Sequence, residues 1–305
     1  MIKTKFGLLS MVVVFFFIFC FDTPAKNVIR VPADYPTIQG AVDAAGDGYR
    51  ILVSPGDYAG AVVNKRVTIR GLGQARIVEG VPWMPGSPLS RTAFRLDILA
   101  GGDGASIIHF TIEGNDELCY GIYSRGADDV TVSHLTINNC FDGIINYNGN
   151  GWRIVHNRIE GFPDGGDGII IGEYIGREAS NNLVAFNRVV DPEIPDNRYS
   201  TPGIILASYY NGMVRENKVV HNRIRLGGYE RACGVEIYDG PGGYTGELSV
   251  VDNKISYNDF RGCSRSFIFY PDEDEGDEYD VKSANDISRN LGDDFSLPRP
   301  RRRGL

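Results

Sequence analysis

A short triplet, which in four of its six occurrences reads Asn, then Arg or Lys, then Ile or Val, recurs along the chain. This repetition restricts the possible folds more than any other feature of the sequence. The six triplets begin at Phe110, Leu135, Asn157, Asn187, Asn217 and Asn253. Between most of them lies a short apolar run led by glycine, such as "GIIN" from Gly143 and "GIII" from Gly168. A unit of this size cannot bury its own apolar face, so successive units must stack on one another.

The stacking that suits such units is a parallel β-solenoid. No helix-length segment with a 3.6-residue period separates the runs after residue 50, which excludes an alternating α/β fold. In a solenoid, equivalent residues of successive coils lie roughly 4.8 Å apart. An inward asparagine at a sharp bend can therefore hydrogen-bond its counterparts above and below, and satisfy backbone groups that would otherwise be buried unpaired. We expect all six triplets to share one register.

One helix is predicted near the N-terminus, in "YPTIQGAVDAAGDG". Ile38, Ala41, Val42 and Ala45 have helical spacing, and Thr37 is a suitable N-cap. A solenoid exposes strand edges and core at its open end, so we expect this helix to cover it.

The entry segment also resembles a known family. "VPADYPTIQGAVDAAGDG" followed by "ILVSPGDY" is similar to the start of many pectin-lyase-like proteins, including pectinesterase-like chains and the β-helix accessory proteins of nitrous oxide reductase. The repeat pattern carries this likeness to about Tyr270. The resemblance implies an all-β fold, a single-stranded right-handed parallel β-helix (solenoid) with an N-terminal capping α-helix. It implies no single activity, because this fold carries many unrelated ones.

The ends of the chain predict export and a charged tail. Lys3 and Lys5 precede an apolar stretch over residues 6–21, followed by "DTPAKN". This pattern predicts a signal peptide over residues 1–25, with a retained membrane anchor as the alternative. We expect a β-helix domain over residues 26–270 and a charged, poorly ordered tail over residues 271–305. The protein is then secreted or held in the cell envelope, with no stable membrane insertion after signal removal.

The charge distribution narrows the choice of partners. The net charge is −8, but seven acidic residues lie between Asp272 and Asp280, so the rest of the chain is nearly neutral. The absence of a broad basic field argues against a nucleic-acid partner. The acidic strip makes calcium a candidate ligand, although its spacing departs from that of an EF-hand loop.

Strand alternation predicts where chemistry lies. It places Ile144 and its equivalents inward, and it makes an outward column of Tyr123, Ile145, Ile170, Ile205, Glu236 and Ile268. The longest insertions occupy three successive coils and should wall a groove beside this column. We predict Glu236, Asp239 and Arg231 as catalytic residues, and Glu173, Arg177, Glu178, Tyr209 and Tyr238 as substrate-binding residues.

These residue types favour a polysaccharide, in particular an acidic, polyuronide-like one, because aromatic rings bind sugars and arginine binds carboxylates. An enzyme with this site would be a polysaccharide lyase, esterase or hydrolase. No family's active site transfers residue by residue. In "GGDGIIIG", Asp167 stands where polygalacturonases have a histidine, and "DPEIPD" lacks the histidine of the similar epimerase motif.

Two other functions stay open. One alternative is a non-catalytic structural or protein-interaction β-helix of the cell envelope that self-associates through an exposed isoleucine strip. It is alternatively an accessory protein for metal-site maturation, because His109, His134 and His156 should stack along one edge. Stacked, solvated imidazoles explain the same pattern.

Four cysteines follow the predicted signal peptide. Cys119 should lie near Cys140, and Cys233 near Cys263, at matching corners of neighbouring coils. Each pair is placed for a disulfide, or else remains as packed thiols.

Overall fold

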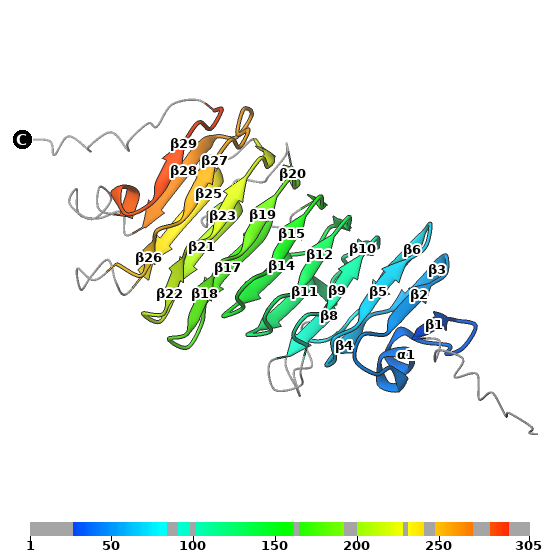
Figure 1. Ribbon diagram of the computed structural model, residues 1–305. Coiled ribbons are helices and arrows are strands. Elements are labelled where there is room, and N and C mark those ends of the chain that lie inside the picture. The colour runs from blue at the N-terminus through cyan, green and yellow to red at the C-terminus, as the bar shows by residue number, and fades with distance from the viewer. Residues whose placement is uncertain are drawn as a thin grey trace, which may run out of the picture.

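The computed structural model describes residues 27–83, 91–97, 102–161, 165–191, 200–227, 231–240, 248–270 and 281–292. The chain winds into an elongated solenoid whose strands stack from one end of the molecule to the other (Figure 1). Strands of successive coils pair parallel and in register. The predicted all-β parallel β-helix is therefore confirmed. The predicted signal peptide and the acidic strip from Asp272 to Asp280 lie outside the described residues.

Four sheets form the walls of the solenoid. Sheet A contains β1 (Val28–Val31), β2 (Arg50–Val53), β5 (Thr68–Gly71), β9 (Ser106–Ile108), β12 (Thr131–Ser133), β15 (Arg153–Val155), β19 (Leu183–Ala185), β23 (Lys218–Val220), β27 (Lys254–Ser256) and β29 (Asp286–Ser288). Sheet B contains β3 (Gly56–Ala59), β6 (Ala75–Glu79), β10 (Thr111–Glu113), β13 (Thr136–Asn138), β16 (Arg158–Glu160), β20 (Arg188–Asp191) and β24 (Arg223–Leu226).

Sheet C carries the glycine-led runs. It contains β4 (Ala61–Val63), β7 (Val81–Pro82), β8 (Arg91–Asp97), β11 (Leu118–Arg125), β14 (Asp142–Tyr147), β17 (Ile169–Glu173), β21 (Thr201–Ser208), β25 (Ala232–Asp239) and β28 (Arg265–Tyr270). Sheet D is short and contains β18 (Glu178–Ser180), β22 (Met213–Arg215) and β26 (Val250–Val251). It adds a wall between sheets C and A in the later coils.

The helix α1 (Ile38–Ala44) forms where the sequence predicts it. The Thr37 hydroxyl accepts a hydrogen bond from the Gly40 N–H at 3.0 Å and caps its first turn. Ile38, Ala41 and Val42 are fully buried. The helix packs against β1, β2 and β4 at the N-terminal end of the solenoid (Figure 1). Its role in closing that end stays a prediction.

The interior consists of aliphatic columns that run through the coils. In sheet A the column Ile107, Val132, Ile154, Val184, Val219 and Ile255 is entirely buried. The inward isoleucines of sheet C, such as Ile144 and Ile169, belong to the same core. The alternation read from the sequence therefore assigns the inward residues correctly.

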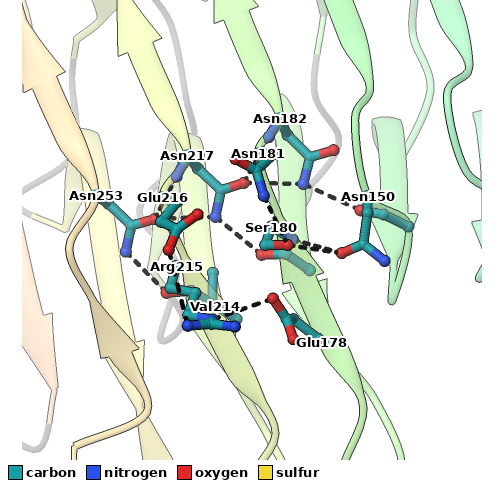
Figure 2. A network of polar contacts seen from close by, with 12 residues as sticks. Asn150, Glu178, Ser180, Asn181, Asn182, Val214, Arg215, Glu216, Asn217 and Asn253 are labelled. Atoms are coloured by element: carbon teal, nitrogen blue, oxygen red, sulfur yellow. Dashed lines mark hydrogen bonds and ion pairs between the residues drawn. The ribbon is translucent and has the colours of Figure 1, made fainter.

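The asparagines form two ladders rather than the single register predicted from the triplets. The first, at the bend between sheets A and B, runs through Asn157, Asn187, Asn222, Asn258 and Asn290. The second, between sheets D and A, runs through Asn182, Asn217 and Asn253 (Figure 2) and continues to Asn285. In each, a side-chain amide donates to the next asparagine's oxygen at 2.9–3.0 Å. The prediction of a single register was wrong because the bend between sheets A and B and the bend between sheets D and A use the same residue types.

A backbone device explains the shared sequence. The residue before nearly every ladder asparagine has a left-handed conformation, including Phe186 at φ 57° and Glu216 at φ 57°. This conformation is costly for side chains with a Cβ. The following asparagine offsets the cost, because its oxygen accepts a backbone N–H and its amide donates to a carbonyl of an earlier coil, as in Asn187 to Ile154 at 2.8 Å.

Two further predictions differ from the structure. The four cysteines described are free thiols, so the disulfides are not formed. The members of the first expected pair nevertheless lie close together. Burial raises the pKa of Cys140 to about 12, and the nearby Cys119 adds a smaller contribution. The solenoid also continues past residue 270, because β29 pairs with β27 and Asn290 extends the first ladder.

Candidate functional site

The outer face of sheet C carries outward columns of side chains. One column runs through Tyr123, Ile145, Ile170, Ile205, Glu236 and Ile268 in consecutive strands. Its first four residues pack with Ala207 as a cluster separate from the solenoid core, as expected of outward side chains. However, Ile145, Ile170 and Ile205 are only 2–5% exposed. The expected exposed isoleucine strip is therefore wrong, and self-association through it loses its basis.

Tyrosine rings help to cover this column. The adjoining outward column reads Tyr147, Gly172, Ala207 and Tyr238, so its middle is small. A Cβ at Gly172 would lie 3.3 Å from the Tyr147 ring, which leans over that position. Tyr209 lies between its neighbours, with its ring centroid 6.0 Å from that of Tyr147 and 5.4 Å from that of Tyr238. These half-buried rings make an aromatic surface over the isoleucines.

Two aspartates lie side by side at the start of neighbouring strands in this sheet. The Asp167 N–H donates to Asp142 Oδ1 at 2.9 Å, and the Gly143 N–H donates to the Asp167 carbonyl at 2.9 Å. Burial raises the pKa of both carboxyl groups. For Asp167, the charges of Asp142 and Glu236 raise it further. Like charges this close cannot both ionise freely, so the pair holds a proton near neutral pH.

Glu236 is the third acid of this face. Its side chain is 3% exposed, and its Oε2 atom is buried with no hydrogen-bond partner. Burial raises its pKa to about 7, although a hydrogen bond from Ser200 opposes the shift. Burial also raises the pKa of Tyr209 well above its usual value, and nearby Tyr147, Asp167, Glu236 and Asp142 add to that rise.

These mutual effects make the five residues one group, which we call the acid–tyrosine cluster. It comprises Asp142, Asp167, Glu236, Tyr147 and Tyr209. Of these, the sequence had indicated Glu236 and Tyr209.

Two predicted acids have structural roles instead. Glu173 is fully buried, and its carboxylate accepts hydrogen bonds from the Gly176 N–H at 2.8 Å and from the Tyr210 N–H. Asp239 is fully buried and accepts from the N–H groups of Ser249 and Val250 at 2.6 and 3.0 Å. Both carboxylates hold turns at the end of sheet C strands. Only Oδ2 of Asp239 is engaged in this way, because its Oδ1 is buried with no hydrogen-bond partner among the described residues, and its catalytic role stays a prediction.

Of the other predicted residues, three lie apart from the cluster. Glu178 lies on β18 of sheet D and pairs with Arg215 at 3.1 Å (Figure 2), on a different sheet from Glu236. Arg177 is exposed in the turn that leads into β18. Arg231 is exposed directly before β25, two residues before Cys233. Tyr238 joins the aromatic surface, as predicted. The structure thus places Glu236, Tyr209 and Tyr238 together and separates them from Glu173, Glu178 and Asp239.

Sequence reasoning missed Asp142, Asp167 and Tyr147 as site residues. A signal for the aspartates existed, because "FDGII" and "GDGII" place an aspartate directly before two successive glycine-led strands. Since these strands pair in register, the two carboxyl groups had to be neighbours. Aspartate before glycine is so common in turns that the coincidence carries little weight by itself.

The cluster has the chemistry of proton transfer rather than of metal binding. Protonated carboxyl groups and phenols both donate and accept hydrogen bonds, and a carboxyl with a pKa near 7 is suited to general acid–base work. In the described part of the chain, no three His, Cys, Asp or Glu side chains are arranged to hold a metal ion. One surface depression lies beside His109 and His134.

The predicted histidine column does form, along the bend between sheets A and B. The rings of His109 and His134 stack at 4.7 Å, and those of His134 and His156 at 5.2 Å. Phe186, His221 and Tyr257 continue the stack, with centroids 5.1–5.2 Å apart.

Comparison with known proteins assigns this architecture to a family. The family described as "Right handed beta helix region" matches residues 98–269, more than half of the chain. The chain belongs to this right-handed β-helix family. No curated protein matches it. Across the described residues, no helix is both long and apolar enough to cross a membrane.

Several solved structures are similar to this family member. An alginate lyase from Paenibacillus sp. str. FPU-7 has 16% identity and a TM-score of 0.45, with 87% of this chain and 95% of that chain covered. The A-modules of two Azotobacter vinelandii mannuronan C-5 epimerases have TM-scores of 0.30 and identities of 16% and 13%. They cover 84% and 85% of this chain, and 94% and 92% of their own. Identities this low transfer no activity to the present chain.

Proposed function

We propose that this protein is exported, binds a polysaccharide along the outer face of sheet C, and acts on it by acid–base chemistry in the acid–tyrosine cluster. The observation that carries the proposal is the Glu236 carboxyl. Its Oε2 atom is buried with no hydrogen-bond partner among the described residues, beside an aromatic surface and two further protonatable acids. Leaving such an atom unpaired costs about 1–3 kcal/mol, and folding alone does not require it.

The two sides of the cluster suit a sugar chain. Half-buried tyrosine rings offer apolar faces to the pyranose ring, and the carboxyl groups offer donors and acceptors to its hydroxyls. With a pKa of about 7, Glu236 is half protonated at neutral pH. It can therefore give a proton to a glycosidic oxygen or remove one from a sugar carbon.

An acidic polysaccharide also fits the cluster. A uronate carboxylate accepts hydrogen bonds from protonated Asp142 or Asp167 and from the Tyr209 hydroxyl, which stays protonated because burial raises its pKa. Lyase or hydrolase chemistry is consistent with this set. Hydrolysis would use two of the carboxyl groups across one glycosidic bond.

The test uses Glu236→Gln and Tyr209→Phe in the full-length protein, with Glu178→Gln as a control on sheet D. Binding to alginate, polygalacturonate and a neutral glucan would be measured by calorimetry. Turnover would be followed through new reducing ends and the absorbance of unsaturated products. Loss of a general acid or base should lower the rate by roughly 10²–10⁴-fold while glycan binding persists. The proposal fails if the wild type binds no glycan, or if Glu236→Gln reacts as fast as Glu178→Gln.

A further inference from the structure

A second surface, on the bend between sheets A and B, carries basic residues in register. Three arginines occupy consecutive strands of sheet B at the position next to the bend: Arg158, Arg188 and Arg223. At the other end of the sheet A strands, away from this bend, Lys218 pairs directly with Lys254, and Arg153 lies two strands before Lys218. The three arginines, together with the stacked rings of His109, His134, His156, Phe186, His221 and Tyr257, form what we call the basic–aromatic ridge.

The same-sign columns are not explained by folding. Like charges directly opposite each other on neighbouring strands destabilise a sheet. Arg188 and Arg223 are exposed, and within the described residues neither has an ion-pair partner. The outward position of these arginines contributes nothing to the core, since earlier coils have threonines at the equivalent position, Thr111 and Thr136. A charge column that costs stability points to a ligand that offsets the cost.

Among the described residues, the acidic groups beside the arginine row are already engaged. Glu160 pairs with Arg158. Asp259 lies opposite Arg223 on the next coil and pairs with Arg225 and Arg261. Within the described residues, Arg188 and Arg223 therefore keep their positive charge, although the whole chain has a net charge of −8.

The stacked rings help to identify the ligand. Phe186 and His221 lie nearly parallel, with centroids 5.2 Å apart and an interplanar angle of 3°, so their faces cover one another. A single-stranded nucleic acid stacks its bases on free ring faces, and the interior of this column offers none. What remains is a line of ring edges beside a row of arginines that repeats once per coil, roughly every 4.8 Å.

We propose that the basic–aromatic ridge binds an acidic polysaccharide, a polyuronate, lying along the solenoid axis. Arginine recognises carboxylates through paired N–H donors, and a polymer with one carboxylate per sugar presents such groups at regular short intervals. A depression lined by Arg70, Leu72, His109 and His134 lies at the N-terminal end of the ring column and extends the path. The ridge lies on a different wall from the acid–tyrosine cluster, so this inference goes beyond the proposed function and does not depend on it.

The test compares the double variant Arg188→Glu/Arg223→Glu with Arg30→Glu/Arg50→Glu in the full-length protein. Arg30 and Arg50 are exposed on the first two strands of sheet A, so the control changes the net charge equally. Affinity for polygalacturonate would be measured at low and high salt, with dextran and single-stranded DNA as further ligands. Thermal unfolding of both variants would verify that they fold.

The ridge variant should weaken polygalacturonate binding by about tenfold or more and flatten its salt dependence, while the control changes little. Equal losses in both variants would assign the effect to net charge and overturn the proposal. Undetectable polygalacturonate binding by the wild type would also overturn it, as would tighter binding to DNA. Glu236→Gln should bind at the ridge like the wild type, which separates this result from failure of the proposed function.

Discussion

The outer face of sheet C and the basic–aromatic ridge are built by the same repeat, yet their charged groups are treated in opposite ways. On sheet C the acids are covered, and burial raises the pKa of Glu236 to about 7. On the ridge, Arg188 and Arg223 are exposed, whereas the neighbouring Arg225 is tied to a partner on the next coil, Asp259. A solenoid leaves outward positions free of core constraints, so chemistry gathers there in columns.

The two surfaces also rest on different interiors. Behind the outer face of sheet C lie the inward isoleucines, such as Ile144, Ile169 and Ile204. Behind the ridge lies the first asparagine ladder, because each ring residue from His156 onward precedes a ladder asparagine. Hydrogen bonds therefore support the ridge, whereas apolar packing supports the wall that carries the acids.

The largest effect should come from breaking the ladder beneath the ridge. Asn187 is buried and bonds to Asn157, Asn222 and the Ile154 carbonyl. Asn187→Leu would leave several of these groups unpaired, at about 1–3 kcal/mol for each. We expect the free energy of unfolding, measured by urea denaturation, to fall by about 3 kcal/mol or more.

Asn290→Leu is the matched control, because Asn290 is half-buried and ends the described ladder. It should lose less stability than Asn187→Leu. If both variants unfolded at the wild-type urea concentration, the ladder would be irrelevant to the stability of the bend, and the contrast between the two interiors would disappear.

Much of this architecture is readable in the sequence. The triplets, the glycine-led runs and the alternation within them fix the parallel coils and assign Ile144 and Ile169 to the core. The merging of two ladders into one was the main error. Asn187 and Asn217 share a local pattern because both bends need a left-handed residue followed by a buried asparagine, and no local feature tells which wall a triplet begins.

The candidate site was less predictable, since it depends on contacts between coils. Alternation places Ile145 and Ile170 outward, but it cannot reveal that other groups cover them. Glu173 and Asp239 look like groove acids in the sequence, yet backbone N–H groups claim both carboxylates. Asp167 is the opposite case, because its importance comes from its register with Asp142.

The second-largest effect should be a pH dependence of the free energy of unfolding, which tests the contrast between the buried acids and the exposed arginines. The pKa of Glu236 is about 7 in the folded protein against an ordinary value of 4.5. Between these values the folded state keeps a proton that the unfolded chain has released, so the free energy of unfolding falls as pH rises through this window. A shift of this size corresponds to at most about 3 kcal/mol.

Glu236→Gln should remove that part of the slope, and urea denaturation at pH 5 and pH 8 measures it. Asp142 and Asp167 have raised pKa values as well, so a smaller slope of the same sign should remain. The ridge variants should leave the slope unchanged, because they alter none of the buried carboxyl groups that cause it. A wild type that is equally stable at both pH values would contradict the burial of these carboxyl groups.

The smallest effect should appear on the ridge and should have the opposite sign. Arg188 lies between Arg158 and Arg223 in register, so Arg188→Gln removes two like-charge contacts without exposing any core group. Unfavourable cross-strand pairs are worth roughly 0.2–1 kcal/mol, and solvent screening places an exposed pair at the lower end. The variant should therefore unfold at a slightly higher urea concentration than the wild type, with the gain fading at high salt. Arg158→Gln is the matched control, because it also removes a like-charge contact but breaks the pair with Glu160, so its stability should stay level or fall. A loss of stability in Arg188→Gln would show that this arginine supports the fold, and the column would then need no ligand to explain it.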